Sequence, residues 1–169
     1  MNQKELKEKL NYNKDTGIFT WKYNASSRVK IGDKAGSKNK EGYIKICINN
    51  KAYSAHRLAW LYEYGNFPKN YTDHINGIKD DNKICNLRDV TPRESAKNKS
   101  IKSTNTSGHV GVSLYKSSGK WKAQICIKGK QTNLGYFDLI EDAIKCRKKA
   151  EVEHGYHKNH GRKSFTNVV

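Results

Sequence analysis

The sequence predicts an α+β protein made of two small modules, and three observations support this. Short runs in which apolar and polar residues alternate, as in half-buried strands, recur along the chain. They are interrupted by stretches with helical spacing of apolar residues, near residues 55–64 and 138–154. Only 35% of the 169 residues are hydrophobic, which is little for one large core. We expect a first module over residues 1–99, a polar linker over 100–107 and a second module over 108–164.

The first module is predicted to begin with a short helix capped by Asn2, with Leu6 and Leu10 on one face. Turn residues, strands and one longer helix follow, because glycine and asparagine punctuate alternating runs. The Asn49-Asn50 turn is expected to join two strands as a hairpin. The expected elements are a turn at 12–17, strands at 18–22, 42–48 and 51–54, a loop at 24–40, and a helix at 55–64 that Gly65 ends.

The chain is strongly basic, with a net charge of +17 that is spread over all three thirds of the sequence. Ten tyrosines and three tryptophans are interleaved with the lysines. Lysines neutralise phosphates and aromatic rings pack or stack, so nucleic acid is the expected partner. A plain solvated surface would not require so much charge. A membrane partner is not expected, because no long basic helix with an apolar face and no transmembrane span is apparent.

Four widely spaced cysteines, Cys47, Cys85, Cys126 and Cys146, include no Cys-x-x-Cys pair. A zinc ribbon or knuckle is therefore not expected. Cys47 and Cys126 lie in strand-like runs, which favours buried thiols. No segment resembles a signal peptide, so a reducing cytoplasm is expected. The protein is also expected to be a monomer.

A central stretch carries residues suited to phosphodiester chemistry. Asp73 and His74 stand side by side, Asn86 follows, and a helical stretch that starts at Pro92 and runs to residue 100 carries Ser95 and Asn98. A neutral imidazole can take a proton from water near neutral pH. A hard cation such as Mg²⁺ needs oxygen ligands and keeps several waters. Since adjacent strand residues point to opposite faces, Asp73 and His74 share a site only if the strand ends or twists there.

This set resembles the phage-type HNH homing endonucleases, whose core is the ββα-metal unit. The resemblance implies that His74 is the general base, that Asp73 binds one divalent metal, Mg²⁺ or alternatively Mn²⁺, and that Asn86 orders the loop. The family's second metal ligand, usually asparagine or histidine, falls on Ser95 here. Asn98, three residues later and on the same helix face, is the candidate that takes over.

His56 and Arg57 stand at the start of the helix 55–64. Helix amides and a guanidinium can hold a phosphate there. Arg57 therefore either steadies the phosphate or makes a surface ion pair, and His56 is interpreted as structural.

The second module is predicted to contain strands at 110–115, 120–127 and 131–137, and a helix at 138–154 with an apolar stripe of Ile140, Ala143, Ile144, Ala150 and Val152. The Val110-Gly-Val112, Lys120-Trp121 and Leu134-Gly-Tyr-Phe137 segments resemble an AP2 domain. That resemblance implies that one face of the sheet enters a DNA groove, while the tail 157–163 is expected to be a solvated basic end. Alternation places Trp121 opposite the polar residues, where it either packs on the helix or supports DNA binding. The predicted DNA-binding residues are Lys116, Lys120, Trp121, Lys122, Gln124 and Lys128.

The sequence thus predicts a metal-dependent endonuclease that cuts double-stranded DNA, with a C-terminal DNA-binding sheet. Two alternatives stay open at this point. Ser95 in the metal-ligand position is consistent with a non-catalytic, decayed DNA-binding protein. An RNA-binding protein would expose aromatic residues on a sheet face, whereas the apolar residues here are needed under the helix.

Overall fold

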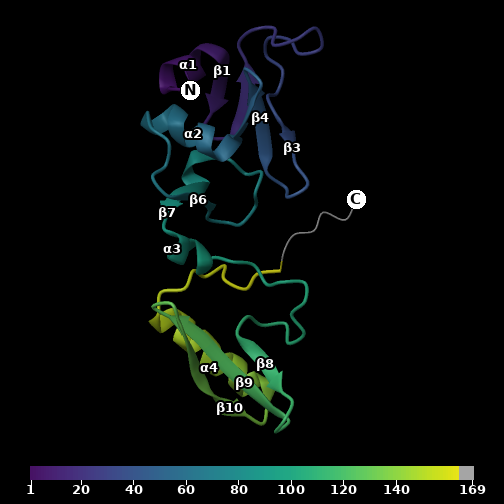
Figure 1. Cartoon of the computed structure of the whole chain (residues 1–169), viewed down its shortest axis with the longest axis vertical. Helices are drawn as coiled ribbons and strands as arrows, with labels where there is room; N and C mark the ends of the chain where they lie inside the picture. The colour runs from purple at the N-terminus through teal and green to yellow at the C-terminus, as the bar shows by residue number, and fades with distance from the viewer. Residues whose placement is uncertain (164–169) are drawn as a thin grey trace. The chain divides into compact units, whose positions relative to one another are not determined.

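The chain folds into two compact units, Met1–Pro92 and Arg93–Val169, each held together by contacts within itself. The structure, a computed structural model, describes residues 1–163, so residue 164 of the expected second module lies outside the described residues. Both units combine helices with antiparallel sheets, as Figure 1 shows, which confirms the α+β prediction. The division at Pro92 falls before the expected end of the first module at residue 99.

The first unit contains two helices and three small antiparallel sheets. The sheets have the strand orders β1-β2, β3-β4-β5 and β6-β7. A short 3₁₀ turn, η1 (Ile84–Asn86), precedes β7. The elements are α1 (Gln3–Lys9), β1 (Leu10–Asn13), β2 (Ile18–Trp21), β3 (Ser37–Lys38), β4 (Ile44–Ile48), β5 (Lys51–Ser54), α2 (Ala55–Tyr64), β6 (Tyr71–His74) and β7 (Leu87–Val90).

Local sequence explains how these elements begin and end. The Asn2 side chain accepts from the backbone N–H of Glu5, whose carboxylate accepts from the Asn2 N–H in return, which closes a capping box at α1. The expected hairpin turn at Asn49 and Asn50 is confirmed, because both residues have positive φ. Leu10 was expected on the helix face but opens β1, and it is still fully buried.

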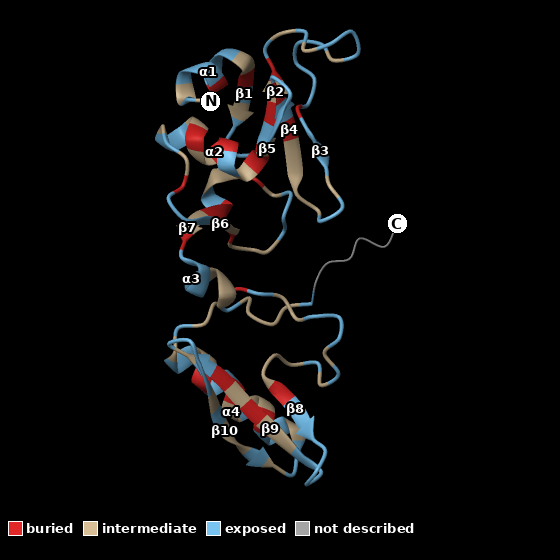
Figure 2. Ribbon diagram, in the orientation of Figure 1, coloured by how far each residue is buried: buried red, intermediate tan, exposed pale blue. Residues whose placement is uncertain are grey.

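The first unit has the larger core, which lies between α1, α2 and the strands. Its buried residues appear red in Figure 2 on these elements. Aromatic rings complete it, with Tyr12 stacked on Phe19 at a centroid separation of 4.6 Å. The buried members are Leu6, Leu10, Phe19, Trp21, Ala35, Ile46, Ile48, Ala55, Leu58, Ala59, Leu61 and Leu87.

The second unit is a three-stranded antiparallel sheet packed on one helix. Its elements after α3 (Pro92–Ala96) are β8 (Val112–Tyr115), β9 (Lys120–Ile127), β10 (Lys130–Phe137) and α4 (Ile140–Glu153), with the strand order β10-β9-β8. The predicted strands and helix are therefore confirmed. Among the described residues of its apolar cluster, Val112, Ala123 and Ala143 are buried and the other hydrophobic residues are partly exposed.

The second unit also buries an arginine. Arg147 on α4 is only 4% exposed. It donates to Glu151 Oε1 at 2.9 Å and to the Gln124 carbonyl at 2.9 Å. Val152, expected in the apolar stripe, is 81% exposed, so that part of the prediction is wrong. Arg147 points inward instead, where its guanidinium has one partner on β9, the Gln124 carbonyl, and another, Glu151, on α4 itself.

The tail is not the solvated basic end that the sequence suggested. Backbone N–H groups of His157 and Gly161 donate to the carbonyls of Lys97 and Lys99. The Ile101 N–H donates to the Arg162 carbonyl. Residues 97–101, which include the start of the expected linker, are therefore tied to residues 154–162 within the second unit.

Two cysteines that the sequence predicted to be buried are exposed. Cys47 and Cys126 are exposed rather than buried. Cys126 pairs with Gln131 and alternates with Ile125 and Ile127, so it faces the polar side of the sheet.

Among the described residues, no helix has the length and apolar character needed to cross a membrane.

We predict that Gly111→Ala destabilises the second unit. A Cβ at Gly111 would collide with the Gln124 carbonyl oxygen and lie 3.0 Å from Arg147 Nε. Gly119→Ala is the matched control, since Gly119 also has positive φ but nothing within 4 Å of its Cβ position. Overpacking typically costs about 1–3 kcal/mol beyond the shared backbone strain. Equal losses in denaturant unfolding of the two variants would contradict the prediction.

Candidate active site

His74 is the last residue of β6 and is only 4% exposed. Its partner across the sheet is Leu87 on β7. The chain turns immediately after it, where the Gly77 N–H donates to the His74 carbonyl at 2.9 Å and Gly77 has a φ of 75°. The strand thus ends at the histidine, as the sequence required if Asp73 and His74 are to serve one site.

Asn82 fixes the imidazole of His74. Nε2 of His74 lies 3.2 Å from Oδ1 of Asn82. The Asn82 amide donates through Nδ2 to the Asp80 carbonyl at 3.3 Å, which directs Oδ1 toward the histidine. Because Oδ1 can only accept, Nε2 must carry the proton, and Nδ1 then carries the basic lone pair.

The surroundings of His74 favour the neutral base. Burial lowers the pKa of His74 below its usual 6.5. The hydrogen bond to Asn82 and the carboxylates of Asp73, Asp81 and Asp80 act in the opposite direction and raise the pKa. The imidazole is therefore unprotonated at neutral pH, and the nearby carboxylates moderate the cost of accepting a proton.

Asn86 holds the loop that follows the histidine. Its Oδ1 accepts from the Asn76 N–H at 3.0 Å. Its Nδ2 donates to Asn76 Oδ1 at 3.0 Å and to the Asp81 carbonyl at 2.8 Å. Asn76 Nδ2 in turn donates to the Asp81 carboxylate at 2.7 Å. These contacts close residues 76–81 into one hydrogen-bonded loop.

Asp73 pairs with an arginine across the sheet. Arg88 lies opposite Asp73 in the register of β6 and β7. Its Nε and Nη2 both donate to Asp73 Oδ2, at 3.1 and 2.7 Å. The Asp73 side chain is 15% exposed, so solvent still reaches this carboxylate. Arg88 was not among the predicted site residues, although its place opposite Asp73 on the paired strand was the signal for it.

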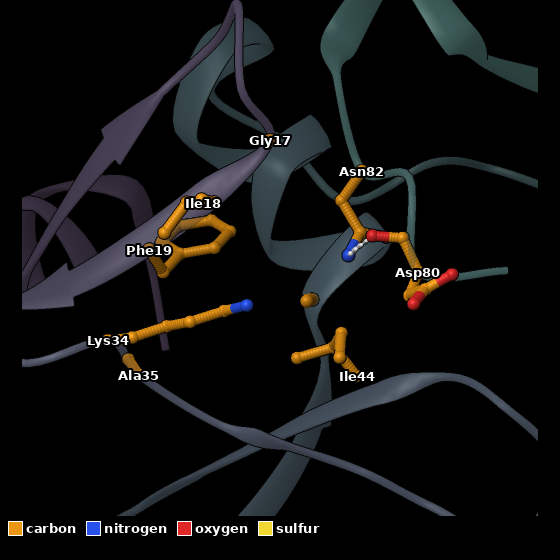
Figure 3. Close-up of a pocket in the computed structure, with 9 residues that line it drawn as sticks. Gly17, Ile18, Phe19, Lys34, Ala35, Ile44, Asp80 and Asn82 are labelled. Atoms are coloured by element: carbon orange, nitrogen blue, oxygen red, sulfur yellow. Dashed lines mark hydrogen bonds between the residues drawn. The ribbon is translucent and has the colours of Figure 1, made fainter. Parts of the chain in front are cut away.

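The β1–β2 hairpin supports the loop that carries Asn82. The Tyr12 hydroxyl donates to the Asn82 carbonyl at 2.7 Å. Gly17 approaches so closely that a Cβ there would lie 2.5 Å from the Lys83 nitrogen. A cavity of about 60 Å³ borders Asn82 and Asp80, and Figure 3 shows the Lys34 side chain reaching across it toward them.

Arg57 and the two candidate ligands lie outside β6. Arg57 is exposed on the first turn of α2, with its guanidinium 5.5 Å from the centre of the Phe67 ring. Ser95 and Asn98 belong to the second unit. The helix α3 ends at Ala96, so Asn98 is not on the same helix face as Ser95 and that expectation is wrong.

Asn98 already has a structural contact. It is 2% exposed, and Arg162 Nη1 donates both to its Oδ1 at 2.9 Å and to its carbonyl at 2.7 Å. Within the part of the chain that the structure describes, no three His, Cys, Asp or Glu side chains gather as a ready metal site. The ligand roles of Asp73, Ser95 and Asn98 stay predictions.

Comparison with known proteins identifies the family. A family model described as HNH endonuclease matches residues 53–97, the segment from β5 to just beyond α3. Protein 3.8 of Escherichia phage T7 is 36% identical over 92 residues, which cover 54% of this chain and 76% of that protein. The chain belongs to the HNH endonuclease family. Its family is therefore one of endonucleases.

The HNH endonuclease is also similar to a solved structure. This structure concerns DNA binding and cleavage by the HNH homing endonuclease I-HmuI, and it is 19% identical. The match covers 99% of this chain and 98% of that chain, with a TM-score of 0.45.

The sheet of the second unit has a polar face opposite α4. Lys122 and Gln124 lie on it, and the β9–β10 pairing places Tyr136 opposite Lys122. Tyr115 and Tyr136 are 45% and 43% exposed, with ring centroids 5.2 Å apart. This tyrosine pair was not predicted, although the alternation of β8 and β10 indicated it.

Other predicted DNA-binding residues differ in their surroundings. Lys120 forms an ion pair with Asp138, with Nζ and Oδ1 3.1 Å apart. Lys116 and Lys128 are exposed in turns. Trp121 packs against the small core on the opposite side of the sheet, so we leave it out of the polar face.

We predict that Asn82→Leu lowers the cleavage rate about 10- to 100-fold, because the His74 ring loses the hydrogen bond that fixes its tautomer and orientation. Single-turnover cleavage of DNA by folded protein is the measurement. Asn70→Leu, the same change at an exposed asparagine, is the control. If both variants cleave at the wild-type rate, Asn82 does not position the base.

Proposed function

We propose that this HNH endonuclease cleaves double-stranded DNA in a metal-dependent reaction of the homing-endonuclease type, with His74 as general base. The observation that carries the proposal is the buried hydrogen bond between His74 Nε2 and Asn82 Oδ1. It leaves Nδ1 as the basic nitrogen, and burial keeps the ring neutral. Nδ1 takes a proton from the attacking water, and Asn86 keeps the adjacent loop in place.

The metal is proposed to be one divalent ion, Mg²⁺ or alternatively Mn²⁺. When bound, such an ion supplies positive charge for the developing phosphorane and the leaving oxygen. Asp73 fits it as a ligand, because its carboxylate is a hard oxygen donor that remains partly exposed beside Arg88. Ser95 offers a hydroxyl as second ligand. Asn98 would have to exchange its bond to Arg162 for the metal, which makes Ser95 the better candidate.

DNA binding is proposed for the polar face of the second unit, as in an AP2-like domain. Lys122 and Gln124 alternate outward along β9, and Lys116 and Lys128 flank the face in turns. Lysine offers a point charge to phosphates rather than a bidentate base contact. The ion pair with Asp138 reduces what Lys120 contributes. This face therefore supplies affinity more than base readout.

The remaining parts of the proposal concern Arg57 and the setting. Arg57 is exposed at the start of α2 and is free to steady a phosphate of the bound DNA. We further propose that the enzyme acts as a monomer in the cytoplasm of a bacterial host cell. Its relative in a phage supports this setting.

Replacing His74 by alanine should abolish cleavage while DNA binding is retained. Removal of a general base typically costs about 10²–10⁴-fold in rate. Relaxation of a supercoiled plasmid with Mg²⁺ is the assay, and excess chelator should stop the wild-type enzyme equally. Full activity of His74→Ala would remove His74 from this role, and full activity in chelator would remove the metal.

The sheet face can be tested by the salt dependence of binding. The double substitution Lys122→Gln and Lys128→Gln should make the log–log slope shallower by roughly 0.9 for each DNA phosphate that the protein no longer neutralises. The matched control, Lys148→Gln with Lys149→Gln, removes the same charge from exposed positions on α4. Equal slopes for the two double variants would show that the sheet is not the DNA-binding face.

A further inference from the structure

His56 lies against the proposed general base. It is the second residue of α2, and its ring centroid is 5.1 Å from that of His74, with the planes nearly perpendicular at 82°. The ring centroid of Tyr43, just before β4, lies 5.4 Å from that of His56 and 5.9 Å from that of His74. The rings of His56 and Tyr43 and the amide of Asn82 therefore surround the imidazole of His74 from three different parts of the first unit.

One atom of His56 is unsatisfied. Its Nδ1 is buried and has no hydrogen-bond partner among the described residues. A buried polar atom without a partner lowers the stability of a fold. Leucine or phenylalanine would supply apolar contacts to the same neighbours without that cost. Packing alone therefore does not explain a histidine at this position.

The ring of His56 is also neutral. Burial, followed by the neighbouring His74 and the positive charges of Lys45 and Arg57, lowers the pKa of His56 to about 3. A neutral ring is not a cationic anchor for a DNA phosphate. What the ring still provides is its contact with the His74 ring and a polar nitrogen inside the site.

We propose that His56 is a positioning residue of the cleavage reaction, which holds the His74 ring in place and keeps Nδ1 available for a hydrogen bond that forms only with DNA bound. The nitrogen is retained for the reaction at the expense of the fold. This inference rests on the proposed role of His74, because His56 acts through that ring. If His56 were merely structural, its substitutions would lower the cleavage rate and the stability of the fold together.

Three substitutions at His56 test the contribution of its ring apart from that of its Nδ1. His56→Phe keeps a ring without nitrogen, His56→Leu keeps neither, and His56→Asn keeps a polar atom near the Nδ1 position. Thermal melting, DNA affinity and the single-turnover cleavage rate with saturating enzyme are measured for each. We expect His56→Phe and His56→Leu to melt no lower than the wild type and to bind DNA as tightly, yet to cleave at least about tenfold more slowly. His56→Asn should cleave faster than His56→Leu.

The chain offers a matched control. His160, in the second unit, also has a buried Nδ1 without a partner among the described residues, and burial lowers its pKa to about 4. His160→Leu should therefore change the melting temperature but not the single-turnover rate of DNA cleavage. A wild-type rate in both His56→Phe and His56→Leu would overturn the proposal, and so would rate losses matched by lower melting temperatures.

His74→Ala, measured in the same assay, separates this inference from the proposed function. If His74→Ala cleaves at full rate, the role of His74 fails and the role of His56 fails with it. If His74→Ala is inactive while His56→Phe and His56→Leu cleave normally, only the inference about His56 is overturned.

Discussion

The hydrogen bond between Asn82 and His74 is the constraint on which the site depends. Both residues are buried, at 2% and 4% exposure, so water cannot substitute for either partner without rearrangement. The bond is only as well placed as the loop that carries Asn82, and Tyr12 and Gly17 of the N-terminal hairpin hold that loop. Elements more than fifty residues away in the sequence thus help to determine which nitrogen of the His74 imidazole is basic.

A comparable dependence on buried polar contacts is found in the second unit. Its strands and helix were predictable, because alternation in β9 assigns Ala123 and Ile125 to the inside. The inward turn of Arg147 was not, since hydropathy alone places an arginine outside. Few residues of the unit's apolar cluster are fully buried, and a guanidinium with a carboxylate and a carbonyl partner is buried in the same unit. Glu151 lies one helical turn from Arg147, but the Gln124 carbonyl is distant in sequence, and no local pattern reveals that partner.

The same distinction applies to the nuclease residues. Asp73, His74 and Asn86 could be selected from the sequence because the set of residues around them resembles the HNH homing endonucleases. The contacts that hold Asp73 and His74 could not be predicted, since Asn82 and Arg88 reach them across a loop and a strand pair. Asn98 shows the converse: its spacing suggested a metal ligand, but the bond from Arg162 depends on a tail with no recognisable pattern.

Charge presents a conflict that the first unit resolves locally. A chain with a net charge of +17 attracts DNA, but the same positive potential disfavours the imidazolium that a general base becomes. Burial is the main cause that lowers the pKa of His56, and the positive charges of Lys45 and Arg57 lower it further. Around His74 the carboxylates of Asp73, Asp80 and Asp81 act in the opposite direction. The acidic run after the histidine therefore does more than form a loop, because it keeps a buried base able to accept a proton within a protein that is otherwise strongly basic.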